Sequence, residues 1–265
     1  MSAGREPGQG AWLTPAWDVP ANVHALSTLR AGGVSVGPYA SFNLAQHVGD
    51  EAAYVAANRA RLRAAAGLPD EPLWLEQVHG IEVVVHERGS ATSMTPPRAD
   101  AAVAFEPDRV CVVMTADCLP VVLADRAGTR VGVAHAGWRG LVGGVLEATV
   151  SALRVPPAEL VAWLGPAIGP DAFEVGPEVR EAFIARQPAN EAGFTRNAAG
   201  RYQADLYALA KIALGRAGVS SITGGGHCTQ RESGGFFSFR RDGGHTGRMA
   251  TLAWLSSAKG DVPGA

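Results

Sequence analysis

The chain has 265 residues, of which 47% are apolar and 18% charged, and its formal net charge at pH 7 is −2. This composition indicates a folded protein with a sizeable core, and the near-neutral charge gives no support for a nucleic-acid or membrane-surface partner. The sequence also lacks a run of about 18 uncharged apolar residues that could span a bilayer.

The N-terminus and the cysteine content point to a reducing compartment. The first ten residues, MSAGREPGQG, hold one Arg and no following apolar segment, which does not fit a signal peptide. Cys111, Cys118 and Cys228 are an odd number of cysteines and too few for a disulfide framework. We therefore expect a cytoplasmic protein whose thiols serve packing, metal binding or catalysis.

The domain organisation follows from composition along the chain. Residues 1–20 are rich in Gly and Pro and are expected to form a flexible N-terminal arm. Residues 21–258 show neither an internal repeat nor a break in composition, which favours one catalytic domain.

The first part of the domain predicts strands around one helix. Alternating or apolar runs bounded by turn residues indicate strands. They cover residues 23–29, 73–75 and 81–86. The helix begins at Ala52, where Asp50 and Glu51 can cap it, and ends at the stop signal Gly67-Leu68-Pro69. His79 falls on the turn between the second and third strands.

Residues 99–140 form the stretch with the richest chemistry. Four apolar runs separated by turns predict four strands. They are residues 101–105, 110–114, 121–124 and 131–134. Cys118 and His135 fall at the ends of two of these strands, where their side chains can converge. A thiolate and an imidazole placed this way indicate part of a metal site or a Cys-His catalytic pair.

The rest of the chain alternates helices with short strands. The glycine-containing turn HAGWRG, residues 135–140, precedes a predicted helix over 141–153. The start of this helix would direct its free backbone N–H groups at that turn. Two further helices, two strands and a terminal helix are predicted. The helices are 177–185, 202–215 and one from Gly247, and the strands are 160–164 and 236–239.

His79, Cys118 and His135 are candidate metal ligands separated by 39 and 17 residues. This spacing is too wide for a zinc finger and is typical of a catalytic site, in which three protein ligands leave a fourth position for solvent. Two buried histidines and a packed Cys118 are the alternative interpretation. Asp117, directly before Cys118, suits a general acid or base, a partner to an imidazole, or a plain turn aspartate.

Several arginines are candidates for binding a small anion. Arg139 lies beside a predicted helix start and could bind an anion there, although its position alone favours a surface ion pair. Arg240, Arg241 and Arg248 crowd the last loop. Asn43, on a polar loop with His47, could recognise a substrate amide or a base edge.

The remaining histidines and cysteines have simpler interpretations. His24 and His86 are expected to be partly exposed surface residues, and Cys111 is expected to be a core thiol. His227 and Cys228 could form a second thiol–imidazole pair, but adjacent residues of a strand rarely direct both side chains to one centre.

Six segments together resemble a known family over about residues 23–255. The segments are RAGGVSVGPYASFNLAQHVGDE with Asn58-Arg59, LEQVHG, TADCLPVVLAD, VAHAGWRG, WLGPAIGP and FFSFRRDGGHTGRMA. They resemble the signature blocks of the bacterial laccase-domain proteins, also called the multicopper polyphenol oxidase or YfiH family, which are now more often regarded as purine nucleoside enzymes.

The resemblance implies a fold, a cofactor and a reaction. The fold is a single α/β domain, a layered sandwich of mixed β-sheet flanked by helices. Zinc is held by His79, Cys118 and His135. The activity is phosphorolysis of adenosine, inosine and methylthioadenosine to the base and a ribose 1-phosphate, with adenosine deamination. We expect a monomer or weak dimer that binds nucleosides and phosphate.

The roles of individual residues in this chemistry are hypotheses. Asp117 would shuttle a proton, and Arg139, Arg240 and Arg241 would grip phosphate. One departure from the family pattern is that Cys228-Thr229 is followed by Gln230-Arg231 rather than by a second cysteine, which leaves the role of Cys228 open.

Three other functions compete with this interpretation. A His₂Cys set also suits copper in a polyphenol oxidase, but the chain has no His-X-His pair of the kind that a trinuclear copper cluster uses. A Cys-His hydrolase would use Cys118 as its nucleophile. The last alternative is a non-catalytic metal-binding or redox-sensing protein.

Overall fold

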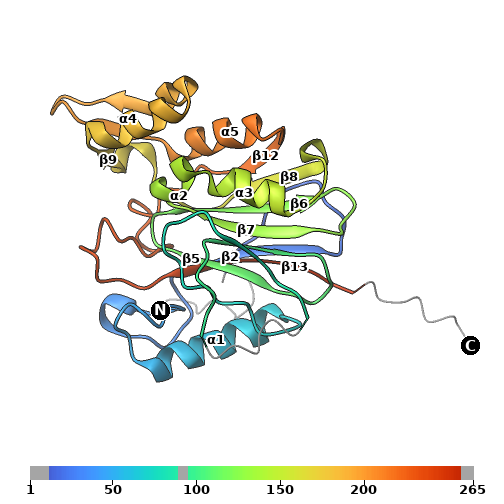
Figure 1. Ribbon diagram of the computed structural model, residues 1–265. Helices are drawn as coiled ribbons and strands as arrows, with labels where there is room; N and C mark the ends of the chain where they lie inside the picture. The colour runs from blue at the N-terminus through green and yellow to red at the C-terminus, as the bar shows by residue number, and fades with distance from the viewer. Residues whose placement is uncertain (1–11, 89–94, 258–265) are drawn as a thin grey trace, which may run out of the picture.

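Two β-sheets stacked face to face form the centre of the fold, with helices on the outer face of each (Figure 1). The computed structural model describes residues 12–88 and 95–257. The four-stranded antiparallel sheet has the order β1 (Trp12–Leu13), β2 (Val23–Thr28), β13 (Met249–Leu255) and β5 (Cys111–Thr115). The six-stranded mixed sheet has the order β12 (Ser221–Gly224), β8 (Leu160–Leu164), β6 (Leu119–Asp125), β7 (Val131–Ala136), β4 (Ala101–Ala104) and β3 (Val83–Val85).

The helices complete a four-layer sandwich. They are α1 (Ala52–Ala66), α2 (Trp138–Gly143), α3 (Val145–Ala152), α4 (Pro177–Arg186) and α5 (Leu206–Arg216), with short 3₁₀ turns at Gly37–Tyr39, Pro157–Glu159, Pro170–Ala172 and Pro188–Gly193. Helix α1 covers the four-stranded sheet, while α2, α3 and α5 cover the six-stranded one. The predicted α/β layered sandwich is therefore confirmed.

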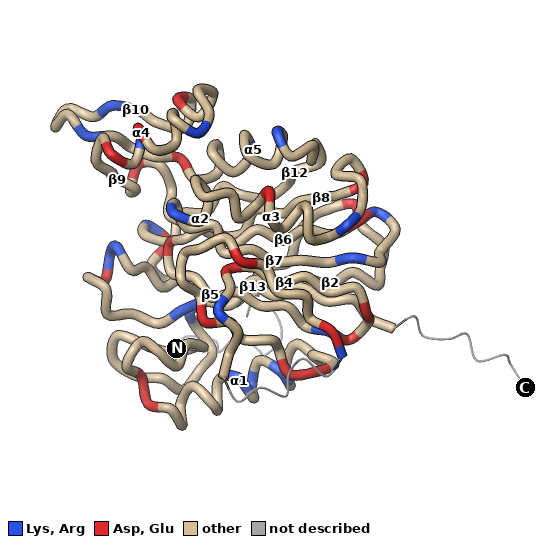
Figure 2. Tube along the Cα trace, in the orientation of Figure 1, with Lys and Arg blue, Asp and Glu red and all other residues tan. Residues whose placement is uncertain are grey.

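The central strands are apolar at nearly every position because both of their faces are buried. In β6, Leu119, Val121 and Leu123 pack toward the helices, while Val122 and Ala124 pack against the other sheet. Each fully buried side chain of this size contributes roughly 1.5–3 kcal/mol to folding. Charged residues consequently lie mainly on loops and outer helices, as Figure 2 shows.

A third, small sheet with α4 projects from one end of the sandwich (Figure 1). It has the order β10 (Phe194–Arg196), β11 (Tyr202–Ala204) and β9 (Glu174–Val175). The helix predicted over 202–215 therefore starts too early. The Asp205 carboxylate accepts the backbone N–H groups of Tyr207 and Ala208 and caps α5, so the preceding residues are free to pair as β11.

Two other predictions near the C-terminus are wrong. The segment predicted as a helix from Gly247 is strand β13, which pairs with both β2 and β5. Residues 236–239, predicted as a strand, form turns and irregular backbone. Short apolar runs do not distinguish helix from strand without their partners.

Smaller differences occur earlier in the chain. The helix predicted over 141–153 is divided between α2 and α3 at Gly144, whose φ of 107° is outside the helical region. Residues 73–75 make only an isolated bridge, from Leu73 to Cys111. Of the expected N-terminal arm, residues 1–11 lie outside the described residues, and Trp12–Leu13 pairs with β2. The described helices include none that is both long and apolar enough to cross a membrane.

Candidate metal centre

Three segments bring His79, Cys118 and His135 together at one end of the six-stranded sheet. Cys118 immediately precedes β6 and His135 is near the end of β7, and the register of these antiparallel strands pairs Leu119 with Ala136. His79 lies on the predicted turn, with a left-handed φ of 59°. The ligand atoms of the three side chains all lie within 4.8 Å of one another.

The donor set and its spacing fit a single metal ion. The Cys118 Sγ and His79 Nε2 atoms are 3.8 Å apart, close to the separation of about 3.6 Å expected across a tetrahedral ion with bonds of about 2.3 and 2.1 Å. The two imidazole centroids are 4.7 Å apart with their planes at 70°. Two nitrogens and one sulfur suit zinc or copper.

Gly137 leaves the room that this convergence requires. A Cβ atom at this position would lie 2.9 Å from Cys118 Sγ and 2.9 Å from His79 Cδ2. The signature HAGWRG therefore carries a steric requirement in addition to its ligand, because the backbone after His135 passes directly against the other two ligands.

Asp100, which the sequence did not single out, is the acidic partner of this site. It is fully buried, and its Oδ1 lies 2.8 Å from His135 Nδ1. The same carboxylate accepts the backbone N–H groups of Val78, His79 and Gly80. Its position directly before a buried strand was the only signal in the sequence, and its register with His135 on the neighbouring strand is seen only in the structure.

The thiol and the imidazole shift each other's protonation. Burial opposes ionisation of Cys118, but the charge of His135 and hydrogen bonds from both histidines outweigh it and lower the Cys118 pKa to about 6. Burial also disfavours the charged form of His135, yet the thiolate and Asp100 raise the His135 pKa to about 9. In the metal-free protein each of the two groups therefore favours the charged form of the other.

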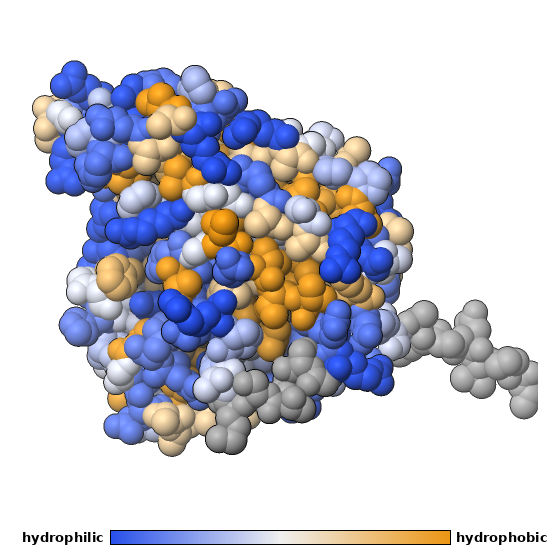
Figure 3. All heavy atoms as spheres, viewed as in Figure 1, coloured by the Kyte–Doolittle hydropathy of each residue, from blue (hydrophilic) through white to orange (hydrophobic). Residues whose placement is uncertain are grey.

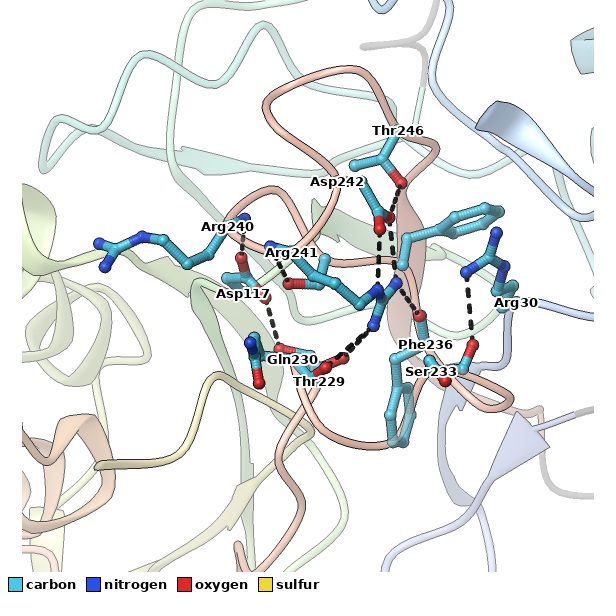
Figure 4. A network of polar contacts seen from close by, with 12 residues as sticks. Arg30, Asp117, Thr229, Gln230, Ser233, Phe236, Arg240, Arg241, Asp242 and Thr246 are labelled. Atoms are coloured by element: carbon cyan, nitrogen blue, oxygen red, sulfur yellow. Dashed lines mark hydrogen bonds and ion pairs between the residues drawn. The ribbon is translucent and has the colours of Figure 1, made fainter. Parts of the chain in front are cut away.

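Asp117 lines the cleft beside Cys118 but bonds to loops rather than to an imidazole. Its Oδ1 accepts from the Thr229 hydroxyl at 2.6 Å and its Oδ2 from the Arg240 backbone N–H at 2.6 Å (Figure 4). The expected role as an imidazole partner thus belongs to Asp100. Asp117 instead joins the start of β6 to the two loops that close the site.

The three candidate ligands open into a cleft of about 370 Å³, within the range of about 300–1,000 Å³ that is usual for small-molecule sites. Its walls are apolar and aromatic, with cationic groups among them. The aromatic residues are Trp138, Phe173 and Phe239, and the cationic ones are Arg139, Arg240 and Arg248.

Two of the three arginines predicted to grip phosphate reach this cleft. Arg139 lies over the Trp138 ring and Arg240 lies near Phe173, both at the cleft wall. Arg241 does not line the cleft: its guanidinium bonds Asp242 and the carbonyl oxygens of three loop residues (Figure 4). Its role is to hold the loop together, because its donors are already used.

Asn43 is also displaced from its expected role. It is fully buried, its Nδ2 donates to Ala45 and Asp50, and its Oδ1 accepts from Ala45 and Arg248. Its amide therefore braces the backbone of Arg248 and is unavailable to a substrate base. His47 from the same polar loop does line the cleft.

The other histidines and cysteines mostly follow expectation. His24 is half-buried, but His86 is almost fully buried, which corrects its assignment to the surface. Cys111 is a buried thiol. His227 Nδ1 pairs with Glu232, whereas Cys228 Sγ accepts from the Gly169 N–H, so the two side chains do not share a centre.

Comparison with known proteins assigns this architecture to one family. Residues 24–256 match the multi-copper polyphenol oxidoreductase laccase family. A purine nucleoside phosphorylase of Pseudomonas aeruginosa is 52% identical over 92% of this chain and 98% of its own length. Purine nucleoside phosphorylase YfiH of Escherichia coli K12 is 51% identical with the same coverage.

Solved structures agree with the sequence comparison. A Neisseria meningitidis protein has a TM-score of 0.89 and 50% identity, covering 94% of this chain and 100% of that protein. YlmD from Geobacillus stearothermophilus has a TM-score of 0.85 and 29% identity, covering 96% of this chain and 98% of its own.

Proposed function

Because this chain belongs to the multi-copper polyphenol oxidoreductase laccase family, and its relatives are named purine nucleoside phosphorylases, we propose that it is a zinc-dependent purine nucleoside phosphorylase. Its substrates are adenosine, inosine and methylthioadenosine, which react with phosphate to give the free base and a ribose 1-phosphate. It also deaminates adenosine. The observation that carries the proposal is a single cleft holding the His-Cys-His group, aromatic walls and arginines.

The aromatic walls suit a purine. Trp138, Phe173 and Phe239 line the cleft, and stacking of a base on an aromatic ring contributes about 1–3 kcal/mol. Phe239 lines the cleft and is 52% exposed, which is unusual for a large apolar side chain. A base lying on this ring would cover it.

The cationic residues suit phosphate. Arg248 faces the cleft, and burial lowers its pKa. Its guanidinium donates to the carbonyl oxygens of Thr246 and Gly247, which are neutral acceptors. The negative charges of Cys118 and Asp117 lie nearby and oppose this shift, but no described carboxylate forms an ion pair with the guanidinium. An anion in the cleft would give Arg248 a direct partner, aided by Arg139 and Arg240.

The candidate ligands and Asp117 suit the chemical step. His79, Cys118 and His135 would hold the ion, which when bound supplies a Lewis acid for activating water or a substrate oxygen. Asp117 is positioned at the cleft wall to hold or move a proton. Its two hydrogen bonds fix the carboxylate in place, and Arg240, whose backbone N–H makes one of them, lines the same cleft.

Two alternatives have specific support. The family name and the His₂Cys donor set fit copper, and hence oxidation of polyphenols. His135 contacts the Cys118 thiol on one side and the Asp100 carboxylate on the other, as the histidine of a thiol hydrolase triad does. Such a hydrolase would keep its activity after chelation, whereas the proposed phosphorylase would lose it.

The test combines elemental analysis with product analysis. Purified protein is assayed for zinc and copper, then incubated with adenosine with and without phosphate, and adenine and inosine are quantified separately. We expect about one zinc per chain, phosphate-dependent adenine and phosphate-independent inosine. Turnover of a phenol with copper bound, and of no nucleoside, would overturn the proposal.

The proposal extends to partners and location. Free nucleosides and phosphate are the partners, the protein is a monomer or weak dimer that binds neither nucleic acid nor membrane, and the cytoplasm keeps its three free cysteines reduced.

A further inference from the structure

The carboxylate of Asp100 contacts both candidate histidine ligands although it lies outside the cleft lining. It is 0% exposed. Its Oδ1 is 2.8 Å from His135 Nδ1 and 2.9 Å from the His79 backbone nitrogen, and its Oδ2 is 3.1 Å and 2.6 Å from the backbone nitrogens of Val78 and Gly80.

The contact with His135 determines which ring nitrogen can bind a metal. A carboxylate accepts hydrogen bonds, so His135 Nδ1 must carry a proton, and Nε2 is the nitrogen that can bind a metal once it has lost its own proton. The backbone N–H of His135 also donates to the Asp100 carbonyl oxygen at 2.7 Å. Both the ring and the main chain of His135 are thus fixed to the same residue.

The contacts with the turn determine where His79 lies. Its φ of 59° is a left-handed conformation that costs a non-glycine residue of order 1 kcal/mol or more. Three successive N–H groups of the turn converge on the Asp100 carboxylate, which compensates for that cost. Without this acceptor, the turn would lose the bonds that aim His79 toward Cys118.

We infer that Asp100 is the positioning residue that assembles the metal site, by setting the His135 tautomer and folding the His79 turn around one buried carboxylate. This inference rests on the metal-binding role proposed above. Carboxylate partners of metal-bound histidines commonly affect metal affinity by about 10–100-fold.

The test compares Asp100→Asn with Asp125→Asn as a matched control. Asp125 is also a buried carboxylate that accepts several hydrogen bonds from a turn, those of Thr129 and Arg130, but it lies at the other end of β6. An asparagine at position 100 keeps the shape but turns an NH₂ group toward N–H donors. Zinc affinity is measured by competition with a colorimetric chelator, and folding by circular dichroism.

We expect D100N to weaken zinc binding by about 10–100-fold and D125N to leave it unchanged. Equal affinities for D100N and wild type would overturn this inference alone. Wild-type protein that binds no zinc would overturn the metal site as well.

If D100N does not fold, a measurement on the wild-type protein tests the positioning role of Asp100 instead. Long-range ¹H–¹⁵N spectra of the zinc-loaded protein report the tautomer of each histidine. We expect His135 to be protonated at Nδ1 and metal-bound at Nε2. A His135 bound through Nδ1 would contradict the role of Asp100.

Discussion

Gly137 shows how strictly single residues constrain the candidate metal site. Its missing side chain lets the backbone after His135 pass against Cys118 and His79. His79, Cys118 and His135 could be proposed as a metal-binding group from the sequence, because their types and wide spacing left that possibility open and the family resemblance favoured it. The steric role of Gly137 and the buried contacts of Asp100 could not, since both depend on which strands are neighbours.

Substituting Gly137 with Ala should therefore weaken metal binding. The added Cβ would lie 2.9 Å from side-chain atoms of two ligands, so at least one ligand must move. We expect a loss of about tenfold or more in zinc affinity, equivalent to about 1.4 kcal/mol, measured by chelator competition. Gly215→Ala is the control, because a Cβ atom added there would have no atom within 4 Å and a helical alanine is tolerated. Equal zinc affinity in both variants would refute the steric role of Gly137.

Zinc affinity should also rise with pH. The ion needs a neutral His135 and an ionised Cys118, whose pKa values without metal are about 9 and about 6. Binding therefore displaces a proton from His135 below pH 9 and a second proton, from Cys118, below pH 6. Titrations between pH 5 and 8 should give a logarithm of the association constant that increases by at least about one per pH unit. A pH-independent affinity would show that these two residues do not bind the ion.

At the scale of elements, the strands were predictable where their burial made them apolar on both faces. Strands β4 to β8 follow directly from such runs. The C-terminal region was not predictable, because the apolar residues of β13 suit a helix until β2 and β5 are known to flank them. The conformation of the loops over residues 228–248 could not be predicted either, since hydrogen bonds between distant segments determine it.

Those loops separate the roles of two arginines. Arg241 bonds the loop backbone from within, whereas Arg248 faces the cleft. Arg241→Ala should lower stability by about 2 kcal/mol, which corresponds to roughly 4–8 °C in a chain of this size. Arg248→Ala should instead raise the KM for phosphate by about tenfold or more with a smaller thermal effect. Thermal denaturation and phosphate kinetics on both variants distinguish these roles, and the reverse pattern would contradict the assignment.

At the scale of the whole molecule, the sandwich supports the site from one end. The two stacked sheets fix the ends of β6 and β7. Phe173, directly before β9 of the projecting small sheet, lines the cleft, and the C-terminal loops close the other side. On the face seen in Figure 3, apolar atoms gather near the centre, and Ile81, ahead of edge strand β3, is 42% exposed. An exposed apolar surface of this kind could support weak self-association, in line with the proposed monomer or weak dimer. Sedimentation at several protein concentrations would check this proposal, and a dimer mass that did not change with concentration would contradict it.

One ion shared by ligands from three separate segments is the central feature of the proposed site. X-ray absorption at the zinc edge of the purified, zinc-loaded protein measures that coordination directly. The predicted spectrum has one sulfur at about 2.3 Å and nitrogen or oxygen neighbours at about 2.0–2.1 Å, four ligands in all. A zinc shell without sulfur, or with two sulfurs, would contradict the assignment of His79, Cys118 and His135 as its ligands.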